Sequence, residues 1–360
     1  MKVLIIANAR YKGGLSGSDA IYDNFIKYWP AKIETWQMLN IDFKPFAACY
    51  FLRIICGIFK ALFCFKKYDF VYSASDFLMD SIPALIMKFK GNKWVAGFYL
   101  IANQGNYIYF KFQFFVWHWI NMYADMVIVS NESMYPAFKE KKKTWINGGI
   151  DLTLSGKGEK EKLYDAVFCG RIHPSKGIDE LIKIWAAVRK YKPDASLAII
   201  GDGDLGKEYI EKKLLKEYDS YMGIRLFGYL GDERYKIYKQ SKIVLYPATW
   251  NHFSLAPVEA MACGCPIVTF CLKAVLEMRD RKYIDGMINV DTIESFVYSI
   301  LYLLEPDKFG DKLYWTDKKR ITYEDFSLAA YESAQFWDYK KQVMRVWDDI
   351  ERELKENWKG

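Results

Sequence analysis

Three charged side chains have the types and spacing to bind a phosphorylated sugar derivative. Arg171 and Lys176 follow the apolar run Asp165–Cys169 and precede a helical pattern, and Glu259 follows a second run, Ile243–Tyr246. Two cations that converge on a diphosphate stabilise its negative charge, and a carboxylate accepts two hydrogen bonds from a ribose diol. These residue types suit an anionic ligand that also carries a diol. A surface turn for the cations and a helix-dipole role for Glu259 are the structural alternatives.

The segments that must position these residues alternate between short apolar strands and helices, which is typical of parallel α/β sheets. In the second half, the expected strands are Asp165–Cys169, Ser196–Gly201, Ile224–Phe227, Ile243–Tyr246 and Pro266–Phe270, and the expected helices are Gly177–Tyr191, Lys207–Tyr218 and Ala256–Cys263. In the first half, strands are expected at Val3–Ala7, Phe70–Ser73, Trp94–Leu100 and Met126–Ser130, with a helix at Ala20–Trp29.

The helix around Glu259 is expected to open near Ala256–Pro257, which would place Glu259 in its first turn. Proline near a helix start leaves no extra donor unpaired. The free N–H groups at Leu255–Val258, together with the helix dipole, would then face an anion.

Polarity and periodicity divide the chain into three parts. A polar hinge at 151–162 separates an N-terminal Rossmann-like domain, 1–155, from a C-terminal Rossmann-like domain, 156–330. The remaining segment, 331–360, carries one long amphipathic helical pattern, Tyr331–Trp358, that is expected to pack on either domain.

The net charge of +7 is concentrated in the first half of the chain. Residues 1–150 contain 18 Lys and Arg against 10 Asp and Glu, or +8, so the remaining residues carry −1. This excess suits an acidic partner, such as an anionic membrane surface or a pyrophosphate-linked lipid, although a solvated basic surface gives the same count. The start of the chain reads as a buried strand and not as a signal peptide, and the seven cysteines lack zinc spacing.

Two apolar segments of the first half are candidates for membrane contact. Phe46–Phe65 is interrupted only by Arg53 and Lys60, which stand seven residues apart and share a helical face. Gly105–Tyr123 is rich in aromatic residues. Charges interrupt both segments too early for a membrane span, so we expect Arg53 and Lys60 to contact a membrane surface. A helix buried against the sheet is the alternative.

The segment Tyr246–Val268, YPATWNHFSLAPVEAMACGCPIV, resembles the donor-binding signature of the retaining glycosyltransferases of family 4, which have the GT-B fold. The resemblance implies two Rossmann-like domains facing across a cleft, with Glu259 on the nucleotide ribose. Glu259 is the second glutamate of the family's pair, and the first, which contacts the donor sugar, is replaced here by Asn251. Phe253, Ser254 and Leu255 occupy the remaining donor-binding positions of the signature.

Further segments carry the same resemblance. Phe168–Gly177 is similar to the family's G-R-x-x-x-x-K-G turn, whose Arg and Lys hold the donor diphosphate, which assigns Arg171 and Lys176 to catalysis along with Asn251. Gly228 and Tyr229 follow a strand at the position near the base, where packing is the alternative for Tyr229. Gly14 belongs to a glycine-rich loop, Lys12–Ser18, that resembles the family's loop facing the donor. Residues 97–104 lack the histidine that many relatives carry there.

The resemblance implies a retaining glycosyltransferase that moves a sugar from a UDP- or GDP-sugar to an acceptor, without a metal or other cofactor. We expect a lipid-linked glycan acceptor, a cytoplasmic protein peripheral on the inner face of the cell membrane, a role in cell-surface polysaccharide or glycolipid synthesis, and no nucleic-acid partner. The sequence names neither the sugar nor the base, and it leaves the linkage and the oligomeric state open.

Two other functions remain open at this point. A sugar-nucleotide epimerase would share the fold and would convert donors without an acceptor. A non-catalytic homologue that partners an active transferase would fit Asn251 in place of glutamate.

Overall fold

The protein is described by a computed structural model in which two compact units are defined. The described residues are 1–10, 17–38, 41, 46–99, 107–130, 132–146, 148–156, 158, 161–203, 205–218, 222–250, 254–280, 285–309 and 322–356. One unit consists of Met1–Gly149 together with Tyr339–Gly360, and the other of Ile150–Asp338. The division therefore falls a few residues before the expected boundary at 155, and the expected terminal segment 331–360 is shared between the units.

The first unit is built on a parallel sheet in the order β2-β1-β3-β4-β5-β6. Its strands are β1 (Lys2–Ile6), β2 (Lys32–Trp36), β3 (Phe70–Ser73), β4 (Lys93–Phe98), β5 (Met126–Val129) and β6 (Lys142–Trp145). Its helices are α1 (Gly17–Tyr28), α2 (Phe46–Leu62), α3 (Leu78–Phe89), α4 (Tyr107–Tyr123) and α13 (Tyr339–Glu356), with a 3₁₀ turn η1 (Glu132–Phe138).

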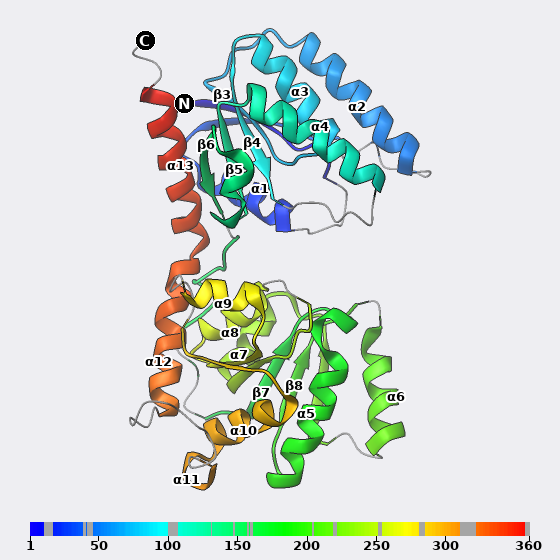
Figure 1. The fold of residues 1–360 in the computed structure, drawn as a ribbon, viewed down its shortest axis with the longest axis vertical. Helices are drawn as coiled ribbons and strands as arrows, with labels where there is room; N and C mark the ends of the chain where they lie inside the picture. The colour runs from blue at the N-terminus through cyan, green and yellow to red at the C-terminus, as the bar shows by residue number, and fades with distance from the viewer. Residues whose placement is uncertain are drawn as a thin grey trace. The chain divides into compact units, whose positions relative to one another are not determined.

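Helices cover both faces of this first sheet. Alternate side chains of β1 and β3, including Ile5 and Tyr72, join one core with Phe25 of α1 and Ile350 of α13. Figure 1 shows α2, α3 and α4 on the opposite side of the sheet, and α3 contacts both of its neighbours. Burial on both faces explains why the central strands are continuously apolar.

The second unit repeats this plan with the order β12-β11-β10-β7-β8-β9, again all parallel. Its strands are β7 (Tyr164–Cys169), β8 (Leu197–Ile200), β9 (Ile224–Gly228), β10 (Ser241–Tyr246), β11 (Ile267–Phe270) and β12 (Met287–Val290). Its helices are α5 (Ile178–Tyr191), α6 (Gly206–Tyr218), α7 (Arg234–Lys239), α8 (Leu255–Met261), α9 (Lys273–Asp280), α10 (Ile293–Leu304), α11 (Pro306–Phe309) and α12 (Tyr323–Ala334), with 3₁₀ turns η2 (Pro174–Lys176), η3 (Gly231–Glu233) and η5 (Gln335–Trp337).

Two cores sandwich this second sheet. Side chains of α5, α6 and α10 pack on one face, where Trp185 and Phe296 are fully buried. Side chains of α7, α8 and α12 pack on the other face with Trp337. The fold class expected from the sequence, α/β with two parallel sheets, is confirmed in both units.

The amphipathic pattern at 331–358 is two helices and not one, so that part of the expectation is wrong. Helix α12 ends at Ala334, a 3₁₀ turn follows, and Asp338 has φ −54° and ψ 118°, which is not helical. The chain at this break is hydrogen-bonded to the start of the second unit, since the Ile150 N–H donates to the Trp337 carbonyl at 2.8 Å. An extended residue at 338 therefore separates α12, which packs in the second unit, from α13, which packs in the first.

Each sheet has one point where the chain reverses the direction in which it adds strands. In the second unit this switch point lies between β7 and β10, and in the first unit it lies between β1 and β3. Ligands of doubly wound sheets bind beyond the carboxyl ends of the strands at such points. The residues predicted to bind the sugar donor should therefore lie at the switch point between β7 and β10.

Candidate functional site

The turn after β7 carries two of the predicted residues, Arg171 and Lys176. Its backbone is fastened by the Ile172 N–H, which donates to the Asp202 carbonyl at 2.9 Å. His173 accepts a hydrogen bond from the Ser175 N–H through Nδ1 at 3.1 Å and so caps η2. The exposed Arg171 and the half-buried Lys176 therefore stand at opposite ends of an ordered turn.

Gly177 brings this turn against the loop after β10. It adopts φ +71°, and a Cβ atom at this position would lie 1.8 Å from the Pro247 carbonyl oxygen. The Thr249 N–H also donates to the Ser175 carbonyl at 3.3 Å. Only glycine allows this approach, so the two loops that flank the switch point are held together by backbone contact.

Arg171 and Lys176 are close enough for their charges to repel. Burial lowers the pKa of the Lys176 ammonium, and the positive charge of Arg171 lowers it further. The Lys176 Nζ also lies 6.0 Å from the centre of the Tyr246 ring. An anion bound between the two cations would relieve their repulsion, which suits this end of the site to a diphosphate.

Helix α8 begins one residue earlier than expected, which corrects the position of Glu259. Ser254 is the N-cap residue with φ −126° and ψ 143°, and its side chain caps no helix N–H. Leu255 is then the first helical residue, Pro257 the third, and Glu259 lies in the second turn instead of the first. Proline at the third position still interrupts no helical hydrogen bond, because the first four N–H groups have no partner within the helix.

Glu259 is held by two residues of α7 that the sequence analysis missed. Arg234 donates from Nε and Nη2 to the two carboxylate oxygens of Glu259, each at 2.8 Å, and the Tyr238 hydroxyl donates to Oε2 at 3.2 Å. The Glu259 side chain is 13% exposed and that of Arg234 is 24% exposed. A carboxylate has about four acceptor positions, and these three donors leave about one of them for a ligand hydroxyl.

The only sequence signal for these two residues is their spacing. Arg234 and Tyr238 stand four positions apart, on one face of a short helix, but they precede Glu259 by more than twenty residues. Nothing in the local pattern links them to that carboxylate.

Gly228 and Tyr229 lie at the carboxyl end of β9. The Gly228 carbonyl accepts a hydrogen bond from the Gly201 N–H at 2.8 Å, and Gly228 itself has φ +68°. The Tyr229 side chain is 76% exposed, so it does not pack in the core. It remains available at the strand end where a base contact was predicted.

The predicted sugar end of the site is only partly within the described residues. Asn251 and Phe253 lie outside them, whereas Ser254 and Leu255 are half-buried at the start of α8. Gly14 of the glycine-rich loop also lies outside the described residues.

The base of that loop is described, and it is held by two buried charged side chains. Asp80 accepts hydrogen bonds from the N–H groups of Asn8 and Ala9 at 2.6 and 3.1 Å. Arg53 donates from Nη1 to the carbonyls of Asn8 and Arg10 at 2.9 and 2.8 Å. Asp80 was not predicted, and it fixes the chain at the switch point of the first sheet.

This role overturns the expected membrane contact of Arg53. Its side chain has no exposed surface, because α2 presents it to backbone carbonyls under the β1 loop. Lys60 is on the exposed part of α2, where its Nζ lies 5.0 Å from the centre of the Trp36 ring. The two residues therefore do not form one exposed basic face.

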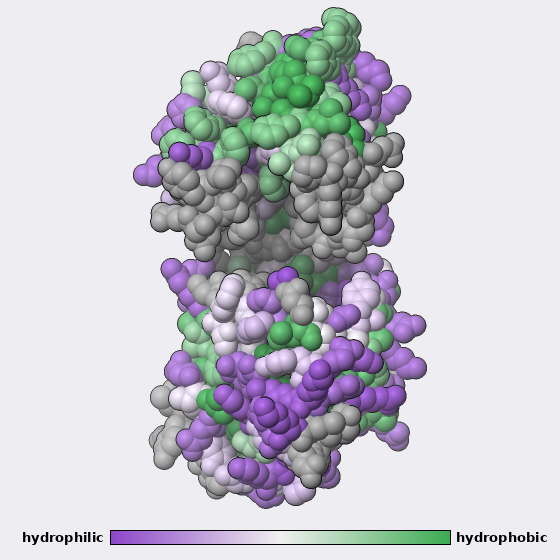
Figure 2. Space-filling view, turned by 90° about the vertical axis from the view of Figure 1, so that its right-hand side faces the viewer, coloured by the Kyte–Doolittle hydropathy of each residue, from purple (hydrophilic) through white to green (hydrophobic). Residues whose placement is uncertain are grey.

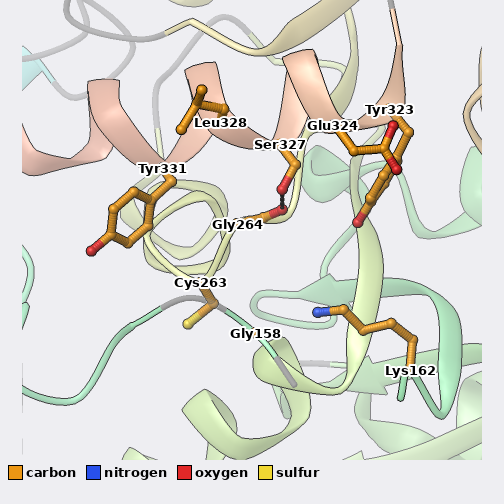
Figure 3. Close-up of a pocket in the computed structure, with 9 residues that line it drawn as sticks. All are labelled: Gly158, Lys162, Cys263, Gly264, Tyr323, Glu324, Ser327, Leu328 and Tyr331. Atoms are coloured by element: carbon orange, nitrogen blue, oxygen red, sulfur yellow. Dashed lines mark hydrogen bonds between the residues drawn. The ribbon is translucent and has the colours of Figure 1, made fainter. Parts of the chain in front are cut away.

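A separate cavity lies at the other end of α8 (Figure 3). It has a volume of about 290 Å³, and its walls include Lys162, Cys263, Gly264, Tyr323 and Tyr331. Ser327 donates to the Gly264 carbonyl at 2.7 Å across one side. Cys263 and Gly264 follow the carboxyl end of α8, so this cavity is distinct from the site at the amino end.

The match to a known family falls on the unit that holds this site. Residues 152–320 match the family described as glycosyl transferases group 1. This part of the chain is therefore similar to glycosyl transferases group 1 domains. An uncharacterized glycosyltransferase of Haemophilus influenzae is 29% identical over 213 residues, which cover 57% of this chain and 58% of that protein. The poly(glycerol-phosphate) alpha-glucosyltransferase of Bacillus subtilis is 25% identical over 172 residues, which cover 48% of this chain and 23% of that protein.

Similarity to solved structures extends over almost the whole chain. Anabaena Alr3699/HepE in complex with UDP-glucose has a TM-score of 0.68 and 15% identity, over 98% of this chain and 100% of the other. The fold is therefore GT-B, as the resemblance implied. The chain spans little more than half the length of the Haemophilus influenzae relative.

Proposed function

We propose that the second unit binds a nucleoside diphosphate sugar at the switch point between β7 and β10. The supporting observation is the backbone contact at Gly177, which places the Arg171–Lys176 turn beside the loop that leads to Glu259. In this arrangement Arg171 and Lys176 bind the diphosphate and Glu259 accepts from the ribose diol. Gly228 and Tyr229 border the base.

The proposed reaction is transfer of the sugar to an acceptor hydroxyl with retention of configuration. The bond between the anomeric carbon and the diphosphate breaks, the acceptor oxygen bonds to that carbon, and the acceptor proton passes to a phosphate oxygen of the leaving group. Arg171 and Lys176 stabilise the charge that develops on that leaving group. Asn251, Phe253, Ser254 and Leu255 are the proposed sugar contacts, with Asn251 supplying an uncharged donor and acceptor.

UDP-sugars are the favoured donors among the two expected classes. A solved neighbour of this fold binds UDP-glucose, and another binds UDP and GlcNAc. No metal takes part in the proposal, because the two cations of the β7 turn supply the positive charge that the diphosphate requires.

The proposed acceptor is a lipid-linked glycan, and the proposed location is the inner face of the cell membrane. Support comes from the charge of +8 on residues 1–150. A Bacillus subtilis relative is named as a poly(glycerol-phosphate) alpha-glucosyltransferase, so its acceptor is a polymer and not a small molecule.

The donor site can be tested by separating its diphosphate end from its nucleoside end. Binding of UDP, GDP and uridine is measured by titration calorimetry after a thermal-shift screen of nucleotide sugars. Arg171→Gln and Lys176→Gln should each weaken UDP binding by roughly 10- to 100-fold, since a charge-assisted contact is lost, while uridine binding stays unchanged. Equal losses for UDP and uridine would place the two cations away from the diphosphate.

A further inference from the structure

Helix α2 is apolar on both its inner and its outer face. Its inner face, with Cys49, Ile54 and Ala61, is buried. On its outer face Phe51 is 57% exposed and Phe59 is 55% exposed. Apart from the exposed Lys60 and the buried Arg53, α2 is apolar on all sides, and such a helix is normally enclosed by protein or by lipid.

The same surface continues beyond α2. Phe65, in the loop after α2, is 83% exposed, and Phe89 at the end of α3 is 66% exposed. On α4, Phe115 and Met122 are 54% and 52% exposed. Helix α3 contacts both α2 and α4, so these side chains belong to one helical layer on one side of the first sheet.

We call this surface, the outer sides of α2 and α4 with Phe65 and Phe89, the α2–α4 face. Figure 2 shows apolar side chains gathered over this part of the first unit. In the described part of the second unit, large exposed apolar side chains are scattered singly, as at Leu163 and Leu328. A contiguous apolar patch of this extent marks an interaction surface.

Helices α2 and α4 carry basic residues and no Asp or Glu. The sequence from Asp42 to Asp69 and from Asp80 to Asp125 has no Asp or Glu between these ends and contains five and four basic residues. Of these, Arg53 is buried, Lys66 pairs with Glu34, and Lys88 and Lys93 pair with Asp125. Among them, Lys90 caps the carboxyl end of α2 by donating to the Ala61 and Leu62 carbonyls, and its Nζ lies 4.8 Å from the Phe65 ring centre.

This charge pattern selects among the possible occupants. In a symmetric dimer each copy would place the lysines of α2 and α4 against the same two helices, which contain no Asp or Glu, and this is unfavourable. A bilayer with anionic lipids offers both the hydrocarbon for the aromatic side chains and the negative charge for the lysines. Within the described residues, no helix is long and apolar enough to cross a membrane.

We propose that the α2–α4 face docks the protein in the interface of an anionic bilayer, with the outer faces of α2 and α4 in contact with the lipid. The proposal rests on the lipid-linked acceptor of the proposed function and names the surface by which the chain reaches it. Arg53, which was expected to contact the membrane, has no part in this contact. The exposed aromatic side chains of α2 and α4 make the contact instead.

The test is flotation of the purified full chain with vesicles of phosphatidylcholine containing about 30% phosphatidylglycerol. Phe59→Glu and Phe115→Glu should each reduce binding roughly tenfold or more, because a charge replaces an apolar side chain in the interface. Leu163→Glu is the matched control, since Leu163 is 61% exposed in the second unit, and it should bind as wild type does. Pure phosphatidylcholine vesicles should bind the wild type more weakly.

Two further measurements keep the proposal separate from the proposed function. Both Phe variants should retain the thermal shift with UDP, which also shows that they are folded. Glu259→Ala should lose that shift and still bind vesicles. Vesicle binding by Phe59→Glu and Phe115→Glu equal to that of Leu163→Glu would overturn the docking proposal, as would wild-type self-association that these two changes abolish without any binding to vesicles.

Discussion

At the scale of single residues, the proposed site depends on a carboxylate kept in one orientation. Glu259 lies in the second turn of α8, and Arg234 grips both of its oxygens from α7. Such a bidentate pair fixes the plane of the carboxylate as well as its charge. The remaining acceptor position of the Glu259 carboxylate is thereby held in one direction. Arg234 is therefore a positioning residue for the proposed ribose contact.

Arg234→Gln should weaken UDP binding by roughly tenfold, because the loss of a charge-assisted pair leaves Glu259 less ordered. Arg234→Lys should recover only part of this loss, since a lysine cannot form the bidentate contact. Titration calorimetry measures both variants, with uridine as a second ligand. UDP and uridine affinities equal to those of wild type would show that the pair does not orient Glu259 for the ligand.

Asp80 has a comparable structural role in the first unit, and its protonation should be visible in stability. The pKa of this carboxyl is raised to about 7, because burial and the negative charge of Asp76, which raise it, outweigh the hydrogen bonds from Ser75, Ala9 and Asn8, which lower it. An aspartate in an unfolded chain has a pKa of about 3.9. Between about pH 4 and 7, Asp80 therefore holds a proton in the folded protein that it has lost in the unfolded chain.

It follows that the contribution of Asp80 to the free energy of unfolding falls as the pH rises through that window. Asp80→Asn removes this loss, so the melting temperature of the variant relative to wild type should be higher at pH 8 than at pH 5. A shift of roughly 5–10 °C is expected, because about two pH units of linkage correspond to roughly 2–3 kcal/mol, and about 1 kcal/mol changes the melting temperature by roughly 2–4 °C at this size. The same difference at both pH values would show that Asp80 does not titrate in this range.

The sequence allowed Glu259, Arg171 and Lys176 to be proposed as site residues because each belongs to a local motif with a recognisable spacing. Arg234 and Asp80 could not be found in this way. Their partners lie 25 and about 70 residues distant, and only the fold brings them together. Arg53 was misassigned for the same reason, since its burial depends on the loop after β1.

At the scale of elements, one glycine joins the two loops of the site. Gly177 begins α5 from a left-handed conformation and lies against the Pro247 carbonyl beyond β10. The position of the Arg171–Lys176 turn relative to α8 therefore depends on the absence of a side chain at residue 177.

Gly177→Ala should lower both stability and UDP affinity, since its Cβ would lie 1.8 Å from a backbone oxygen and force the loops apart. Gly231→Ala is the control: Gly231 has φ +50°, with no atom within 4 Å of the added Cβ. The control should be destabilised by only about 1–2 kcal/mol, the strain of a left-handed residue, and should still bind UDP. Comparable thermal unfolding and UDP affinity in the two variants would contradict the role given to Gly177.

The buried strands near the centre of each sheet were predicted closely, because burial on both faces leaves an uninterrupted apolar run. The edge strands β2 and β6 were not predicted. Both carry exposed charged residues, such as Lys32 and Lys142, that are typical of edges and hide the strand pattern. The break between α12 and α13 was missed because both helices are amphipathic and the interruption is only four residues long.

At the scale of the whole molecule, the chain completes its first unit with its last described helix. Val343, Val346 and Ile350 of α13 are fully buried in the core formed with α1 and the first sheet. The Trp347 ring lies 5.7 Å from that of Trp29. The first unit is therefore discontinuous in sequence, whereas the second is one continuous segment.

Trp347→Ala should destabilise the first unit by about 3–5 kcal/mol, the usual effect of removing a large buried aromatic side chain. Hydrogen exchange should show lower protection in β1 and β3, with β7 and β10 unchanged, because the core around Trp347 belongs to the first unit alone. Tyr331→Ala on α12 serves as the comparison, because α12 belongs to the second unit and this change should leave the protection of β1 and β3 unchanged. Uniform loss of protection across both sheets after the Trp347 change would show that the two units unfold together.

The most direct test of the central claim is UDP binding by Glu259→Ala, measured by titration calorimetry beside wild type and the exposed-surface control Glu332→Ala. If the switch point between β7 and β10 binds the nucleotide through Glu259, wild type and the control should bind UDP with the same affinity. Glu259→Ala should show no measurable binding. UDP or GDP binding by Glu259→Ala at the wild-type affinity would contradict this placement of the site.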